Sequence, residues 1–418
     1  MDISVQTPSS LFTLFLDQPP SCLEFCPTAP DHLLISTYLL NEVPEEGSPA
    51  PTQVRTGSLQ LFKLDTHSCQ LSPVQSLPLD SAVFDFQFSP RDPSLFAVAL
   101  SKSVVSLYRI EISNDELNLS ARIVFVRSIN IHEDAAQLAL CLAWIPTGSR
   151  QQNKEDTPDI KDGFAVSFSD GRVSVFYTKS DIGTHDDAKL SEIQLGGFPI
   201  ESTGDEQLPV LFAGNDMHHI RGATLTEMDC TDDVSSRSWQ LDDRGRHHDA
   251  GVTAILPLFA DETGIIILTG SYDENIRVYH FKGRAEVLAS KNLGGGVWRL
   301  RLIQIEDSQA TDIRSRHYQS DLDLRRSYLI LASCMHGGAR LLRVSYFASR
   351  GNSQDGEGKW EINLLAEFKE HQSMNYASDF YRGGQKGDGP ENSAEECPVL
   401  CVTSSFYDKR VCVWKANI

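Results

Sequence analysis

The chain has 418 residues, 40% of them hydrophobic, and its 57 acidic and 37 basic residues give a net charge of −20 at pH 7. The mean surface field therefore repels nucleic acid and anionic membranes and attracts basic proteins and cationic groups, although acidity also simply keeps a large protein soluble. The sequence has no run of 18 apolar residues and no basic start of a secretory signal. We expect a soluble, cytosolic protein that binds neither nucleic acid nor membrane.

Nine cysteines are spread along the chain. Cys22 and Cys26, and likewise Cys397 and Cys401, are separated by three residues inside expected strands. Zinc ligands usually lie on turns at tighter paired spacings. We therefore expect reduced cysteines in strands or core, and no metal ion.

One strand–turn–strand pattern recurs along the chain and is clearest in residues 269–279 and 404–414. Each copy has a small hydroxyl residue, an Asp four positions later and an aromatic residue six positions beyond the Asp. Between the Asp and the aromatic, apolar and polar side chains alternate as in a half-buried strand. An Asp in the tight turn accepts hydrogen bonds from backbone N–H groups. The pattern predicts small antiparallel sheets.

The pattern occurs seven times, less regularly away from the two clearest copies. In chain order the units are 33–37 with 57–62, 95–100 with 104–108, 164–168 with 173–176, 210–213 with 220–225, 265–281, 328–333 with 340–344, and 399–414. Innermost strands are expected before these units at 22–25, 83–88, 140–144, 252–255, 297–300 and 376–380. The fourth unit is the exception, because its inner strand is the least clear and it has no closing aromatic residue.

Seven such units are typical of a seven-bladed WD40-type β-propeller, an all-β fold. We expect one domain over 1–418, with blade units at about 20–64, 81–110, 138–178, 208–226, 248–282, 295–346 and 371–416. A strand at about 10–17 should complete the last blade and so close the ring. Long surface loops, several of them disordered, are expected at about 41–56, 147–162, 181–206, 228–247, 306–326, 350–360 and 382–396.

Few motifs of known enzymes are present. There is no Gly-x-Ser-x-Gly elbow, and residues 294–296 (Gly-Gly-Gly) are followed by neither Lys-Ser/Thr nor a helix, so we expect a turn and no bound cofactor. His248 fits, with Thr269, Asp273 and Tyr279, the hydrogen-bonded set that holds a WD-repeat blade together. These four residues are therefore expected to be structural, and the fold alone favours a binding protein.

Some side chains exceed what the blade pattern requires. Trp298 and Arg299 begin an inner strand, while Cys334 and His336 occupy a blade turn that more ordinarily carries Asp. Core packing is the more ordinary role for a Trp at such a position, and an ion pair with Asp or Glu on a neighbouring inner strand is the ordinary role for Arg299.

Acidic and aromatic residues also occur on the other inner strands. They are Glu24, Asp85, Tyr376 and Asp379. Aromatic faces and carboxylates around one pocket would attract a cation by cation–π and Coulomb interactions.

Four segments in order, 269–274, 295–299, 332–337 and 405–408, resemble the WD-repeat diphthine methyl ester hydrolases of diphthamide biosynthesis. The similarity is good over about 248–414 and looser before it, and Gly-Gly-Val-Trp-Arg together with Cys-Met-His is its most specific part. The chain departs from the family pattern in the turn at 215–219 (Asn-Asp-Met-His-His), and at Tyr279, where a Trp-Asp ending would be usual.

The resemblance implies hydrolysis of the methyl ester of methylated diphthine, a modified histidine of elongation factor 2. It suggests His336 as the general base acting on water, and Arg299 or glycine-loop N–H groups as oxyanion donors. Trp298 and Tyr376 would hold the trimethylammonium group of diphthine, aided by Glu24 or Asp85.

Two alternatives stay open at the catalytic centre. Cys334 is an alternative nucleophile. The His336 turn is also expected on the opposite face of the propeller from the Trp298 segment, and His248 would then be the better base.

The alternative function is a non-catalytic adaptor that presents elongation factor 2 or another protein to a separate enzyme. A monomer is expected.

Overall fold

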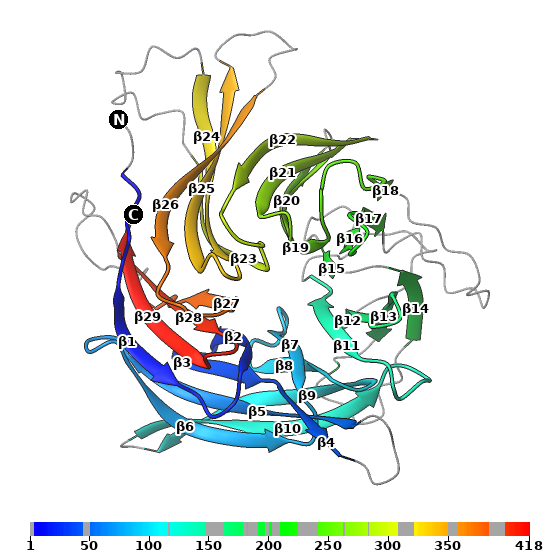
Figure 1. The fold of residues 1–418 in the computed structure, drawn as a ribbon, viewed down its shortest axis with the longest axis vertical. Coiled ribbons are helices and arrows are strands. Elements are labelled where there is room, and N and C mark those ends of the chain that lie inside the picture. The colour runs from blue at the N-terminus through cyan, green and yellow to red at the C-terminus, as the bar shows by residue number, and fades with distance from the viewer. Residues whose placement is uncertain are drawn as a thin grey trace.

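The computed structural model describes residues 4–44, 51–115, 118–146, 162–178, 182, 191–196, 200–202, 210–224, 241–261, 264–282, 284–307, 322–349, 358–383 and 398–418. Within these ranges, no helix is long and apolar enough to cross a membrane. The strands form seven antiparallel sheets arranged around a central axis (Figure 1). The predicted seven-bladed propeller is confirmed.

Each blade consists of an inner strand at the axis, two middle strands and an outer strand. Blades 1 to 3 contain β2 (Pro20–Cys26), β3 (Ala29–Thr37), β5 (Thr52–Asp65) and β6 (Gln70–Leu79); β7 (Val83–Phe88), β8 (Leu95–Leu100), β9 (Val104–Asp115) and β10 (Asn118–Asn130); and β11 (Ala139–Trp144), β12 (Asp162–Phe168), β13 (Arg172–Thr178) and β14 (Ser191–Gly196). Blades 4 and 5 contain β15 (Ile200–Ser202), β16 (Val210–Gly214), β17 (Ile220–Thr224) and β18 (Leu241–Asp242); and β19 (Val252–Asp261), β20 (Gly264–Ser271), β21 (Asn275–Lys282) and β22 (Arg284–Asn292). Blades 6 and 7 contain β23 (Arg299–Asp307), β24 (Leu322–Ser333), β25 (Ala339–Ser349) and β26 (Lys359–Phe368); and β27 (Asn375–Phe380), β28 (Pro398–Ser405), β29 (Arg410–Asn417) and β1 (Ser10–Phe15).

Clusters of buried side chains fill the spaces between neighbouring blades. Between blades 5 and 6, Leu268 and Val278 share one cluster with Ile330 and Leu342, and all four are fully buried. Burial of such a side chain contributes about 1.5–3 kcal/mol. Each sheet therefore covers the apolar face of the next one, and the stability of a blade depends on its neighbours in the ring.

The N-terminal strand closes that ring, as predicted. β1 pairs with β29 in antiparallel register, with Thr13 opposite Cys412 and Leu14 opposite Val411. Figure 1 shows the blue first strand beside the red last one. Leu16, just after β1, is buried against blade 7 and blade 1. The outer strand of blade 7 thus comes from the opposite end of the chain.

A hydrogen-bonded set of four side chains holds blade 7 together. His371 Nε2 lies 2.7 Å from Thr403 Oγ1, and the Trp414 indole N–H donates to the same oxygen over 3.3 Å. Asp408 accepts from the backbone N–H of Gln372. Burial lowers the pKa of His371 to about 4. The sequence shows the same signal as in blade 5, since a histidine lies four residues before the inner strand in both blades.

The expected loops are only partly open to comparison. Residues 41–56 are not simply a loop, because β4 (Leu39–Val43) pairs with the first residues of β5 and extends blade 1 as a hairpin. Most of the other expected loops lie outside the described residues. The parts concerned are 147–161, 183–190, 203–209, 225–240, 308–321, 351–357 and 384–397. Blade 4 has the shortest strands: β15 spans three residues and β18 two.

Candidate functional site

A cavity of about 530 Å³ opens at the axis, on the face where the inner strands begin. Its wall contains the first residues of four inner strands and the turn between β20 and β21. The lining includes the charged and aromatic residues Asp85, Asp216, Tyr272, Trp298 and Arg299. Among the lining residues that the structure describes, Arg299 alone is positively charged. The cavity therefore combines aromatic, acidic and guanidinium groups.

The turn between β24 and β25 lies on the same face as the segment leading into β23. The Trp298 N–H donates to the Ser333 carbonyl over 2.8 Å, and a Cβ atom at Gly295 would collide with the Cys334 carbonyl. Met335 forms a bridge with Asn375 at the start of β27. The prediction that the His336 turn and the Trp298 segment occupy opposite faces was wrong, because inner strands begin where the turns between the two middle strands lie.

His336 and Trp298 nevertheless line different cavities. His336 lies in a second cavity of about 390 Å³, between the ends of blades 5 and 6, with Gly294, Arg340 and Glu367 in its wall. The His336 side chain is 58% exposed, and its Nε2 lies 3.6 Å from Glu274 Oε1. The structure therefore does not bring the predicted base to the predicted cation site.

Cys334 and His248 belong to the scaffold by their surroundings. Burial raises the pKa of the Cys334 thiol to about 12, and that thiol donates to the carbonyl of Ala332. Burial also lowers the pKa of His248 to about 3. The His248 ring stacks on Tyr279 at 5.2 Å, and its Nε2 lies 3.0 Å from Thr269 Oγ1. A nucleophile would need a thiolate, and a base would need access to substrate, so neither environment suits the role.

Trp298 lies between two other aromatic side chains at the cavity mouth. Its ring centroid is 6.1 Å from that of Tyr272 and 4.9 Å from that of Tyr376. Trp298 and Tyr376 are half-buried, whereas Tyr272 is 44% exposed. Trp298 and Tyr376, both predicted from the sequence, are thus together, and Tyr272 is an addition from the turn of blade 5.

Arg299 reaches across the axis from blade 6 to blade 2. Its guanidinium donates to Asp85 Oδ1 over 3.0 Å. Asp85 also accepts from the Cys22 thiol and from the backbone N–H of Leu142 in blade 3. Burial alone would lower the pKa of Arg299, but neighbouring acidic groups including Asp85 outweigh it and raise the pKa. The ion pair forms part of the cavity wall and fixes the guanidinium there.

Glu24 and Asp379 have scaffold partners of the same kind, outside the cavity lining. Arg301 lies 3.4 Å from Glu24 Oε2, and burial raises the pKa of Glu24 although Arg301 acts in the opposite direction. Asp379 Oδ2 accepts from the backbone N–H of Phe25 and pairs with Arg382. These two carboxylates tie blades 6, 7 and 1 together below the site.

Asp216 is the acidic group that sequence reasoning did not select. It is exposed, lines the cavity, and sits in the turn between β16 and β17. Burial and the negative charge of Asp216 together raise the pKa of Tyr272. The available signal was the departure of residues 215–219 from an ordinary blade turn.

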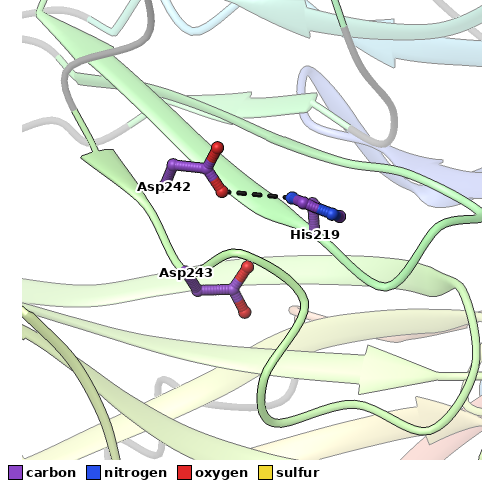
Figure 2. Close-up of side chains that lie close together, drawn as sticks. All are labelled: His219, Asp242 and Asp243. Carbon is purple, nitrogen blue, oxygen red and sulfur yellow. Dashed lines mark hydrogen bonds and ion pairs between the residues drawn. The ribbon is translucent and has the colours of Figure 1, made fainter.

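His219, Asp242 and Asp243 lie close enough together to hold a metal ion (Figure 2). His219 Nδ1 is 3.1 Å from Asp242 Oδ1. Asp243 accepts from the backbone N–H of Ile220 over 2.8 Å and from the Tyr279 hydroxyl over 3.2 Å. Hydrogen bonds to the scaffold thus account for this cluster without a metal ion.

No protein-family model matches the chain. Curated relatives are the diphthine methyltransferase of Schizosaccharomyces pombe, 29% identical over 96% of both chains, and that of Saccharomyces cerevisiae, 25% identical over 98% of this chain and 99% of the other. This chain is similar to proteins named diphthine methyltransferase over nearly its whole length. The diphthine methyltransferase homolog of Dictyostelium discoideum is 21% identical over 96% of this chain and 98% of its own.

Among solved structures, that of Chaetomium thermophilum Sqt1 bound to the N-terminus of the ribosomal protein L10 is similar to this chain with a TM-score of 0.49 at 12% identity, over 96% of this chain and 97% of its own.

Proposed function

We propose that this chain hydrolyses the methyl ester of methylated diphthine on elongation factor 2. The observation that carries the proposal is the bipolar cavity at the axis, with an aromatic and acidic mouth and a guanidinium in its wall. Methylated diphthine has the matching pair of groups, a quaternary ammonium and an ester. Similarity to diphthine methyltransferases over 96% of the chain supports the choice of diphthine.

The cation would lie at the mouth of the cavity. Trp298 presents a half-buried ring there and Tyr272 an exposed one, and Asp216 adds a negative charge beside Tyr272. A cation over an aromatic face gains about 0.5–1 kcal/mol at exposed sites and about 2 kcal/mol when desolvated. Asp85 and Glu24 contribute less than the sequence suggested, because each already faces an arginine.

The ester would lie against Arg299. When water attacks the carbonyl carbon, the C=O electron pair moves onto oxygen, and the guanidinium N–H groups stabilise that oxyanion. Collapse of the intermediate breaks the bond to the methoxy group, which takes up the proton that the attacking water gives up and leaves as methanol, and the acid remains. The Asp85 ion pair keeps the guanidinium in position before substrate arrives, so little reorganisation is needed during the reaction.

The name of the relatives, diphthine methyltransferase, favours a second candidate function, methyl transfer. Hydrolysis transfers the acyl group of the ester to water, releases methanol and removes one CH₂ unit from the protein mass. Transfer from a methyl donor onto diphthine would add one. The two directions are therefore separated by the sign of a single mass change.

The experiment incubates purified protein with methyl-esterified elongation factor 2 in water labelled with heavy oxygen, and follows the substrate by mass spectrometry. We expect loss of one CH₂ unit with incorporation of heavy oxygen into the carboxylate. Arg299→Met should lower the rate about 100- to 1,000-fold, as for loss of an oxyanion donor. The matched control is Arg122→Met, because the Arg122 side chain is 69% exposed and pairs with Glu111 in β9, on an outer part of blade 2. No turnover at stoichiometric protein would favour the adaptor function.

A further inference from the structure

The aromatic rings of the cavity wall belong to a longer series, which leaves the cavity at Trp298 and returns to it at Phe84. From Trp298 the series passes to Tyr376 at 4.9 Å, from Tyr376 to Phe406 at 5.6 Å, from Phe406 to Tyr38 at 6.0 Å and from Tyr38 to Phe84 at 5.2 Å. Tyr407 extends it outward, 5.1 Å from Phe406. These rings and Tyr272 form what we call the aromatic arc. It runs over one face from blade 5 through blades 6, 7 and 1 to blade 2.

The blade pattern does not require the side chains of this arc. In the turns of blades 5 and 7, the side chains of Asp273 and Asp408 make the turn hydrogen bonds. Tyr272 and Tyr407, just before them, contribute backbone N–H groups, which donate to the Gly251 carbonyl and to Ser373 Oγ, and their rings are not needed for those bonds. Tyr407 is 68% exposed. Tyr272 is also exposed, and the other five rings of the arc are half-buried. A connected set of aromatic rings that reaches solvent in this way is typical of interaction sites.

A carboxylate borders the arc at its blade 5 end, where Asp216 is exposed beside Tyr272. The nearby lysines already have oxygen partners: Lys102 pairs with Asp80 at 3.1 Å, and Lys409 donates to the Asp17 carbonyl over 2.7 Å. With a chain charge of −20, this surface complements a cationic partner.

We propose that the aromatic arc is the docking surface for a basic polypeptide segment, one of whose side chains enters the axial cavity. Lysine and arginine side chains can lie on aromatic faces while their charges meet the bordering carboxylate. The arc is continuous with the cavity through Trp298, so a segment on the arc leads into the cavity. The docking proposal rests on the proposed function in one respect: the side chain that enters the cavity is taken to be methylated diphthine.

Binding is tested separately from catalysis with unmodified, fluorescein-labelled peptides. A twelve-residue peptide of alternating lysine and glycine is compared with its glutamate–glycine counterpart by fluorescence anisotropy, and only the basic peptide is expected to bind. Tyr407→Ala and Phe406→Ala should each raise Kd about two- to fivefold, as for loss of an exposed cation–π contact. The matched control is Phe125→Ala on β10, since Phe125 is 56% exposed but lies on an outer strand.

Equal effects of Tyr407→Ala and Phe125→Ala would overturn the inference, as would equal binding of the acidic peptide. Sedimentation of the protein alone tests the other occupant, a second copy of this chain. A dimer that Tyr407→Ala dissociates would also overturn the proposal.

Kinetics give a second test. With methyl-esterified elongation factor 2, Tyr407→Ala should raise KM about two- to fivefold and leave kcat unchanged, because Tyr407 lies outside the cavity lining. With a single blocked methylated-diphthine residue as substrate, neither constant should change. Turnover of both substrates with no effect of Tyr407→Ala would refute the docking surface alone, whereas turnover of neither would refute the proposed function alone.

Discussion

The ion pair that crosses the axis makes a quantitative prediction about stability. The Asp85 side chain is 3% exposed and that of Arg299 is 18% exposed, with 3.0 Å between them. Asp85→Ala leaves the guanidinium facing the axis without its partner and removes the acceptor for the Leu142 N–H. Breaking a buried ion pair in this way costs about 3–5 kcal/mol. Because Arg299 retains some access to solvent through the cavity, we expect about 3 kcal/mol.

Arg299→Met should cost less, about 1–3 kcal/mol, because Asp85 keeps donors from Cys22 and Leu142. The double variant should be less destabilised than the sum of the single variants, by about 2 kcal/mol, since each single variant alone strands a charge. In a chain of this size, about 1 kcal/mol shifts Tm by about 1 °C. Urea unfolding followed by circular dichroism is therefore the more sensitive assay.

Asp80→Ala is the matched surface control. The Asp80–Lys102 pair has side chains that are 85% and 38% exposed, so its loss should cost less than about 1 kcal/mol. Strict additivity of the Asp85 and Arg299 variants would refute the reasoning. So would an Asp85→Ala cost no greater than that of Asp80→Ala.

Three further outcomes are expected. The pKa of His371 falls from 6.5 to about 4 on folding. The folded state therefore binds the proton less well than the unfolded state, and the free energy of unfolding has its full value above pH 6.5 and decreases below it. By pH 5 about 2 kcal/mol should be lost, and urea unfolding at several pH values should show a smaller slope for His371→Gln. Trp298→Ala should raise KM for the methyl ester about two- to thirtyfold, and Trp298→Phe less, because phenylalanine retains an aromatic face; equal KM values would contradict the cation site. Removal of residues 1–16 should expose the free edge of β29 and cause aggregation, which light scattering during size-exclusion chromatography would detect.

The architecture was largely predictable because the blade is a local device repeated along the chain. Asp273 and Asp408 mark tight turns, and the strand alternation around them is readable in any single copy. Even the closing strand followed from counting strands. Blade 4 was harder, since its inner strand has three residues and too little sequence to show a period. The hairpin of β4 and β5 was missed because the Pro- and Glu-rich stretch between the two strands suggested only a loop.

The candidate site was predictable only in part. Trp298 and Tyr376 stood out as aromatic residues at strand starts, and their rings do lie together, although only Trp298 lines the cavity. Asp216 did not stand out in the sequence, because its place at the axis depends on how blade 4 faces blade 6. No local sequence pattern encodes that arrangement of blades. His336 was misjudged for the opposite reason. An imidazole in a blade turn is conspicuous in the sequence, but the sequence does not tell which of two adjoining cavities it lines.

The pairing of β1 with β29 also sets the order of events during synthesis. The ribosome makes β1 first and its partner last, and at about 5–20 residues per second the interval is about 20–80 s for a chain of this length. Throughout that time the first strand has no partner, and the axial cavity does not yet exist, because its walls come from blades on both sides of the unclosed gap. A nascent chain with an unpaired strand edge for that long is exposed to aggregation until the last blade emerges.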